Sequence, residues 1–439
     1  MNRILYRYKQ LKRQLKMKRI MTIGAMAVAL LTVTSCSETE TEINPAPGHG
    51  GQVALGVTPN LKVEAGTKAA TKSVVDGDLI TYTDYATAPG LGVLVTNSGA
   101  TGWYTPDGTD DRHHVWYMGD AKGENWLSIT ERGSAYDNIK EVPYYLTETV
   151  GKVYAYYPYD ESINISSISS EGDLKIPVTV QASGSIAASV NNAEKIWNTS
   201  WKTNTANKSK KQVTADEKDY LYFAGPNRYV NNGRASGQPS FNPEDGPAND
   251  NADNPGYLIS LEMQHGLAMV SFRVYDGGHL SDENVTFTKF QLKNHDSGQL
   301  FKTGNGKMSL VDGVITGNAN SGSVTRTITD YTLMKQVGQG EQESASAFIA
   351  TSSVKGQNVS KSVSALVYPL KFEEDQIDAV ITLKIGNGDP VDYTVTLPGY
   401  EWTAGTNCIY TFSAGRNKLT LTDVSVVEWE DDPQDDIQL

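Results

Sequence analysis

The sequence predicts an all-β protein built from β-sandwiches. Short runs of alternating apolar and polar residues recur along most of the chain, and a period of two is typical of half-buried strands. Clusters of Gly, Asn, Asp and Pro separate these runs and indicate turns. Heptads, a Gly-rich phosphate loop and a sustained internal repeat are absent from the sequence. Many short strands joined by turns favour a sandwich.

The first segment of the chain predicts export. A basic leader runs into the apolar residues 20–31 and then into small residues before Cys36. That order is typical of a secretory signal peptide, residues 1–35, and the apolar part is shorter than the roughly 20 residues of a membrane-spanning helix. Val33-Thr34-Ser35-Cys36 resembles a bacterial lipobox. We therefore predict that Cys36 carries diacylglycerol and a further acyl chain, the alternative being an ordinary signal peptide with an incidental cysteine.

Residues 36–51 predict a lipidated, flexible tether. They are polar and rich in Pro and Gly, so they cannot bury a core. The acidic run 37–42 resembles the signal that sends Bacteroidetes lipoproteins to the outer face of the outer membrane. The alternative is a solvated linker whose acidic residues contain no sorting signal.

The charge of the mature chain argues against nucleic acid as a partner. Without residues 1–35, 30 basic residues remain against 51 acidic ones, a net charge of −21 at pH 7. Such a surface repels phosphate backbones. About 400 residues are enough for two or three domains with cores of their own.

The first predicted domain spans residues 52–255. Its expected strands are 52–57, 61–65, 91–96, 152–157, 174–180 and 220–224, with one helix at 186–201 where apolar residues recur every three to four positions. The small, basic residues 66–72 predict an exposed loop that a trypsin-like protease could cut.

A loop rich in Asn, Asp, Gly and Pro, residues 231–256, predicts the boundary to a second domain, residues 256–439. Its expected strands are 257–274, broken by Gly266, and 286–292, 364–370, 379–385, 392–397, 408–412 and 418–429.

No group of residues in the sequence predicts catalysis, a metal site or a cofactor site. Residues 107–114 and 249–254 gather possible ligands, but their spacing matches no zinc or calcium template, and we interpret both as solvated loops. His265 has no nucleophile elbow beside it, so we expect a structural histidine bonded to the backbone. Cys408 lies in an alternating pattern and is expected to be buried and free.

Four aromatic residues are candidate ligand contacts. Trp103, Tyr104, Trp116 and Tyr117 lie among turn residues, where exposed rings could stack on sugars or on a partner protein. Trp402 and Trp429 instead close strand patterns, so core packing is their expected role.

Several elements, in their order along the chain, resemble the fimbrillin (FimA/Mfa-like) lipoproteins of Bacteroidales. They are the lipobox, Gln-His-Gly-Leu-Ala-Met-Val-Ser-Phe at 264–272, Trp-Thr-Ala-Gly-Thr-Asn-Cys-Ile-Tyr at 402–410, and the closing strand that ends at Trp429. The resemblance implies two transthyretin-like β-sandwich domains in tandem and a role in surface fimbriae.

The resemblance also implies an assembly mechanism. In this family a protease removes the first strand of a subunit, and the emptied groove accepts a strand from another subunit. Here the removable strand is residues 52–65, and the cut would follow Lys68 or Lys72. The loop has no arginine, which is the better-known cleavage residue of the family.

We therefore expect a non-enzymatic fimbrial subunit on the outer membrane, in contact with other subunits, with membrane lipid through Cys36, and with a host or bacterial surface ligand. Five carboxylates and a proline in residues 430–436 disfavour the tail as a donor strand and favour a tip or accessory position. The closing strand 418–429 stays open as an alternative donor. The alternative function is a glycan-binding surface lipoprotein beside a nutrient importer.

Overall fold

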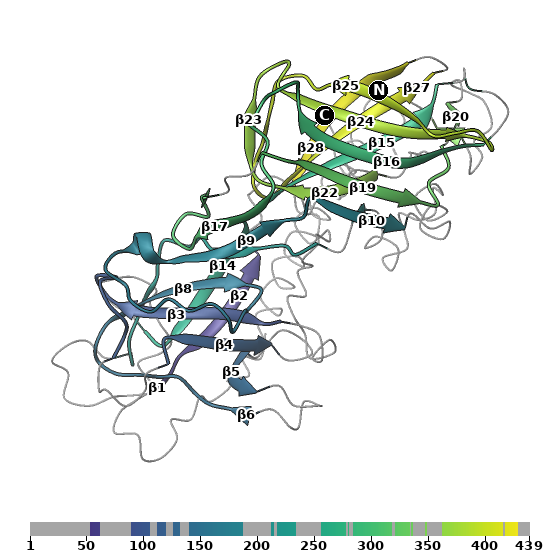
Figure 1. Cartoon of the computed structure of the whole chain (residues 1–439). Coiled ribbons are helices and arrows are strands. Elements are labelled where there is room, and N and C mark those ends of the chain that lie inside the picture. The colour runs from purple at the N-terminus through teal and green to yellow at the C-terminus, as the bar shows by residue number, and fades with distance from the viewer. Residues whose placement is uncertain are drawn as a thin grey trace, which may run out of the picture. The chain divides into compact units, whose positions relative to one another are not determined.

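Strands joined by turns make up the described part of the chain, with one short 3₁₀ helix, η3 (Glu171–Asp173). Figure 1 shows these strands gathered into several sheets. The all-β prediction is confirmed.

This computed structural model describes residues 53–61, 89–105, 112–119, 126–131, 140–187, 212–214, 217–233, 256–277, 280, 284–317, 321–333, 335–336, 347–348, 362–415 and 418–428. The chain divides into two units, Met1–His49 and Gly50–Leu439, and every described residue belongs to the second.

A nine-stranded sheet contains most of the strands that precede residue 266. Its order is β2 (Gly56–Leu61), β14 (Leu258–His265), β12 (Leu221–Phe223), β8 (Gly151–Tyr157), β3 (Leu91–Asn97), β4 (His114–Gly119), β5 (Trp126–Glu131) and β6 (Lys140–Glu141), with β13 (Tyr229–Val230) beside β8. A separate pair joins β1 (Val53–Ala54) to β7 (Tyr145–Leu146).

Both faces of this sheet are covered along its central strands. In β3, Val93 and Val95 enter one hydrophobic cluster, whereas Leu94 enters another. In β8, Tyr154 likewise lies on the opposite face from Val153. A strand buried on both faces has a nearly continuous apolar run instead of an alternating one, which explains the Leu-Gly-Val-Leu-Val sequence of β3.

Two further sheets form a sandwich. One has the order β11 (Gln212–Thr214), β22 (Ser362–Val367), β15 (Ala268–Asp276), β20 (Lys335–Gln336) and β21 (Ala347–Phe348), with β27 (Thr406–Ala414) on β15 and β28 (Leu419–Glu428) on β27. The other has the order β10 (Ser183–Ala187), β19 (Ser323–Thr329), β16 (Val285–Asn294), β24 (Ile377–Ile385) and β25 (Val391–Thr396).

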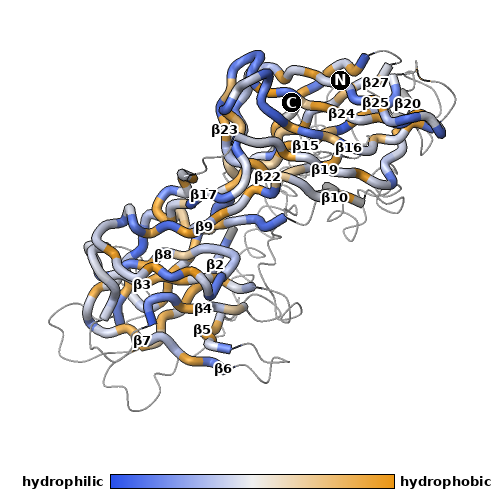
Figure 2. Tube along the Cα trace, in the orientation of Figure 1, coloured by the Kyte–Doolittle hydropathy of each residue, from blue (hydrophilic) through white to orange (hydrophobic). Residues whose placement is uncertain are grey.

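The inner faces of these two sheets share one core. Phe272 of β15 packs on Phe290 of β16 with ring centroids 4.7 Å apart, and Phe287 meets Tyr331 edge to face. Hydrophobic and hydrophilic residues are interleaved along the strands (Figure 2), as expected when one face of each sheet is buried.

Two small sheets complete the fold. One has the order β18 (Ile315–Thr316), β17 (Gly304–Ser309) and β9 (Lys175–Val180), and the other pairs β23 (Leu370–Phe372) with β26 (Tyr400–Trp402).

Consecutive strands change sheets at Gly266. β14 pairs with β2 and β12 in the nine-stranded sheet, whereas β15, which begins two residues after Gly266, pairs with β22 and β27. The break that the sequence predicts at Gly266 is confirmed. The division into domains 52–255 and 256–439 stays a prediction.

The helix predicted at 186–201 is wrong at its start. Ile186 and Ala187 belong to β10, which pairs in parallel with β19, and residues 188–201 lie outside the described residues. The apolar spacing suited a helix, but pairing with a distant strand decides the backbone conformation here.

Candidate functional site

Strand β2 lies at the edge of the nine-stranded sheet. It runs parallel to β14 from the pair Gly56–Leu258 to the pair Leu61–Met263, and β14 is its single strand partner within the described ranges. An edge strand is held by one ladder of hydrogen bonds, so it can leave without breaking the rest of its sheet.

Buried side chains anchor the segment that contains β1 and β2. Val53, Leu55 and Val57 are 1%, 4% and 3% exposed. The backbone of Leu55 is held on both sides, because its N–H donates to Tyr144 O at 2.8 Å and its carbonyl accepts from the Tyr117 hydroxyl at 2.8 Å. The segment therefore closes a core as well as extending a sheet.

The strand that pairs with β2 has one apolar, buried face. Ile259, Leu261 and Met263 of β14 are fully buried and share a hydrophobic cluster with Leu55 and Val57. Loss of residues 53–61 would uncover these side chains and leave a groove with an open strand edge. Lys68 and Lys72, the predicted cleavage positions, lie outside the described residues, as does Cys36.

Strand β28 is the edge of the sheet that contains β15. It pairs antiparallel with β27 from Ala414–Leu419 to Thr406–Glu428, with a bulge near Thr411. Its Val426 is 40% exposed. The strand predicted at 418–429 is thus present as Leu419–Glu428, and Trp429 lies outside the described residues.

The structure buries two of the four candidate ligand-contact aromatics. Tyr104 is 2% exposed and donates to Thr149 O at 2.8 Å, and Tyr117 is 1% exposed. Both tyrosines are core residues whose hydroxyl groups donate hydrogen bonds to backbone carbonyl oxygens.

The two tryptophans are half-buried, and each stacks on another ring. Trp103 lies parallel to His113 at 4.8 Å, and Trp116 lies parallel to Tyr159 at 4.7 Å. Trp116 also donates from Nε1 to Pro89 O at 2.8 Å. The two indoles pack against different hydrophobic clusters, so the structure does not bring the four residues together as one site.

His265 contacts a carboxylate that the sequence did not suggest. Its Nδ1 lies 2.9 Å from Asp219 Oδ2, and both side chains are buried. The histidine is therefore buried beside a carboxylate, which the sequence analysis did not foresee. Asp219 is 46 positions earlier in the chain, in the turn before β12, and only the pairing of β12 with β14 brings the two together.

A second histidine lies in an aromatic cluster on β4. His114 Nε2 is 2.6 Å from the Tyr156 hydroxyl, and its ring lies 4.9 Å from that of Tyr159. Burial lowers the pKa of His114 to about 4, although the nearby Asp160 carboxylate opposes the shift. The imidazole is therefore neutral at pH 7.

Cys408 is 1% exposed in β27, as predicted. Burial raises the pKa of its thiol to about 11, so the reactive thiolate is scarce at neutral pH.

The described ranges contain neither a metal-binding cluster nor a membrane-spanning helix. No group of three or more His, Cys, Asp or Glu side chains in those ranges is placed to hold a metal ion. None of their helices combines the length and the hydropathy needed to cross a membrane.

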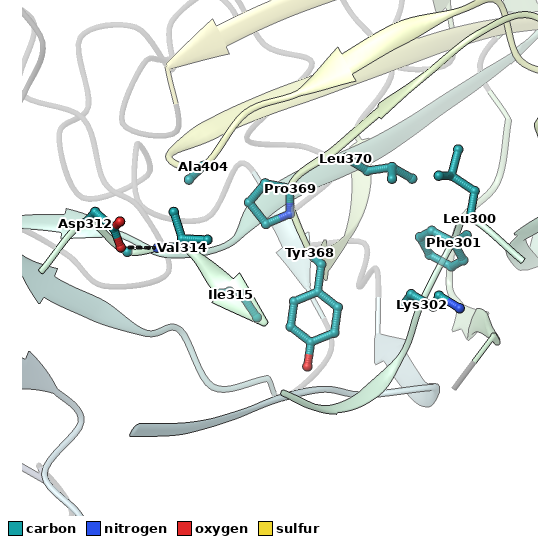
Figure 3. Close-up of a pocket in the computed structure, with 11 residues that line it drawn as sticks. Leu300, Phe301, Lys302, Asp312, Val314, Ile315, Tyr368, Pro369, Leu370 and Ala404 are labelled. Carbon is teal, nitrogen blue, oxygen red and sulfur yellow. Dashed lines mark hydrogen bonds between the residues drawn. The ribbon is translucent and has the colours of Figure 1, made fainter. Parts of the chain in front are cut away.

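A pocket of about 440 Å³ lies beside the β17–β18 hairpin (Figure 3). Its wall comes from three places: the hairpin with the residues before it, the link between β22 and β23, and the turn before β27. The lining residues are Leu300, Phe301, Lys302, Asp312, Gly313, Val314, Ile315, Tyr368, Pro369, Leu370 and Ala404. Its volume is in the range of small-ligand sites.

Comparison with known proteins gives one sequence match. Residues 240–429 match the model of the fimbrillin-like family. No curated protein matches the chain.

Solved structures to which the chain is similar come from species of Bacteroides and Porphyromonas. A fimbrial protein of Bacteroides vulgatus is 12% identical with a TM-score of 0.42, over 86% of this chain and 99% of its own. A Bacteroides uniformis protein provisionally assigned to cell adhesion is 14% identical with a TM-score of 0.43, over 86% and 98%. The tip fimbrial protein Mfa3 of Porphyromonas gingivalis, with a C-terminal truncation, is 10% identical with a TM-score of 0.33, over 80% and 97%.

The family match begins before β14 and ends just after β28, so it covers the strand that pairs with β2 and the closing strand. Residues 240–429 of this chain are thus similar to the fimbrillin-like family.

Proposed function

We propose that this protein is a fimbrial subunit, in a tip or accessory position, that is exported as a surface lipoprotein and contributes to adhesion. The observation that carries the proposal is the edge strand β2, which has one strand partner, β14, and packs in the same core as the buried face of that strand. The family match over residues 240–429 supports it independently.

Assembly proceeds by strand exchange. A trypsin-like protease cuts after Lys68 or Lys72 and releases the segment that contains β1 and β2. Each fully buried aliphatic side chain contributes about 1.5–3 kcal/mol, so the uncovered groove is a strong acceptor for the strand of another subunit.

The donor properties of the chain favour a terminal position. Residues 430–436 contain five carboxylates and Pro433, and burying unpaired carboxylates in an apolar groove costs several kcal/mol. A subunit that accepts a strand but donates none occupies one end of a filament. Donation of β28 itself is the open alternative, because it is also an edge strand.

The test is protease-triggered assembly. The purified mature chain is mixed with a trypsin-like protease and followed by gel electrophoresis and electron microscopy. The expected product is a trimmed monomer that binds a synthetic peptide of residues 52–65 and caps polymers of another fimbrillin. Long homopolymers would contradict the tip position, and a trimmed chain that binds neither peptide nor fimbrillin would contradict strand exchange.

A matched control uses the double variant Lys68→Gln, Lys72→Gln. It should fold normally, resist trimming at this loop and fail to cap. Capping by the untrimmed variant would show that removal of the first strand is not required.

The alternative of a glycan-binding surface lipoprotein predicts a different distribution on cells. Electron microscopy with antibody against this protein should label filaments if the fimbrial proposal is right. Diffuse labelling of the outer membrane would favour the alternative.

A further inference from the structure

The pocket beside the β17–β18 hairpin has features that the fold alone does not explain. Its rim contains Leu300 and Val314, which are 38% and 54% exposed and are two of the four exposed large hydrophobic residues in the described ranges. Leaving such side chains in water beside a concave apolar wall is unfavourable, so a covering group would stabilise the site.

The charged groups of the pocket differ in their partners. Asp312 accepts the backbone N–H of Val314 at 3.1 Å. No described residue forms an ion pair or a hydrogen bond with the Lys302 ammonium group. In Figure 3, Ala404, Asp312 and Val314 lie on one side of the pocket, and Leu300, Phe301 and Lys302 on the other. The matching ligand has an apolar body followed by a negative charge.

The last described strand ends next to this pocket. Glu428 of β28 pairs with Thr406, and Ala404, two residues before Thr406, forms part of the pocket wall. Crossing the ladder takes about 5 Å, and two residues of chain span at most about 7 Å. The end of β28 therefore lies within about 12 Å of Ala404. Between Ala404 and Thr406, where β27 begins, stands Gly405, a residue with φ +75°.

The sequence that follows has the required chemistry. Residue 429 is tryptophan, and Glu430, Asp431 and Asp432 come directly after it. We propose that the pocket binds the chain's own C-terminal segment, with Trp429 against the apolar wall and the following carboxylates beside Lys302.

Covalent attachment favours this occupant over a separate molecule. A segment attached to the end of β28 has an effective concentration at the pocket in the millimolar range, so even a weak contact is populated. The Lys302 ammonium group attracts the acidic residues, and Val314 and Pro369 provide the apolar surface on which the indole packs.

Hydrogen–deuterium exchange of the mature full-length chain tests the proposal. Peptides covering residues 429–432 should exchange at least about tenfold more slowly than an unstructured chain. Val314→Asp should remove that protection, because it places a carboxylate in the apolar wall. Peptides within β28 should keep theirs, which shows that the variant is folded.

Val391→Asp is the matched control, since Val391 is 49% exposed on β25 and lies outside the pocket. It should leave the exchange of residues 429–432 unchanged. Lys302→Gln should weaken the protection, and added salt should weaken it in the wild type but not in Lys302→Gln.

Three results would overturn the proposal. The first is rapid exchange of residues 429–432 in the wild type, and the second is protection that survives Val314→Asp. The third is protection that disappears on tenfold dilution, because a segment from a second copy, and not the chain's own, would then occupy the pocket.

Discussion

Arg326 and Glu217 form a fully buried ion pair that joins distant segments. Arg326 is 0% exposed and Glu217 is 2% exposed in their side chains. Arg326 also donates to Gln181 O at 3.1 Å, and Glu217 accepts the backbone N–H of Leu366 at 3.1 Å. The pair therefore connects the residues before β10 and β12 to β19 and β22.

Removing one partner leaves the other charge buried alone. We expect Arg326→Met to lower the free energy of unfolding by about 3–5 kcal/mol, measured by urea denaturation. Lys371→Met, which breaks the exposed Lys371–Glu401 pair, should cost at most about 1 kcal/mol. Equal effects from the two variants would contradict this role of the buried pair.

The lowered pKa of His114 predicts how the free energy of unfolding depends on pH. Its folded pKa of about 4 lies below the unfolded value of about 6.5, so the unfolded chain binds the extra proton between these values. The contribution of His114 to stability is complete above about pH 6.5. It decreases as the pH falls toward 4, by at most about 3 kcal/mol.

Urea midpoints measured between pH 4 and pH 7 check this, and His114→Gln should flatten the curve over that range. His295→Gln is the control, because the stability contribution of His295 should change with pH in the opposite direction. The bond to Asp378 raises the pKa of His295, so its contribution is present at low pH and is lost as the pH rises through the raised value. An unchanged slope in His114→Gln would contradict a buried neutral imidazole.

Among the elements, the junction between β14 and β15 leaves little room for a larger residue. A Cβ at Gly266 would overlap Sδ of the fully buried Met308. We expect Gly266→Ala to cost about 1–3 kcal/mol in thermal or urea unfolding, because the core must shift. Gly99→Ala, where the nearest atom lies at an ordinary 3.6 Å, should change stability little.

Alternation along the sequence predicts strands better than it predicts their partners. The runs at 91–96, 152–157 and 379–385 match β3, β8 and β24 closely. By contrast, β4 was missed because its aromatics follow two histidines and precede a glycine, which resembles a turn.

Pairing could not be predicted, because a period of two shows which face is buried and says nothing of the neighbour. β14 and β15 are adjacent in sequence yet belong to different sheets. The Asp219–His265 contact and the pocket wall depend on such pairings, so local spacing could not reveal them. The edge position of β2 was not predicted, because the family resemblance named residues 52–65 only as a removable first strand.

For the whole molecule, we predict that a lipid anchor at Cys36 holds these surfaces at the outer membrane. We predict that Cys36→Ala abolishes incorporation of a fatty-acid probe in cells and leaves unlipidated precursor. The structure describes no part of residues 1–49, so the prediction comes from the lipobox alone. Labelling of the Cys36→Ala chain at the wild-type level would contradict it.

The parallel pairing of β2 with β14 also has a consequence for the order of synthesis. Thr58 donates to Ile259, 201 positions further along the chain. At about 5–20 residues per second, the strand that is made first waits roughly 10–40 s for its partner to be made. Throughout that interval β2 has no strand partner, although the partners of Leu55 at Tyr117 and Tyr144 are already made. The nine-stranded sheet therefore reaches its full width only late in synthesis, when β14 is made and takes its place between β2 and β12.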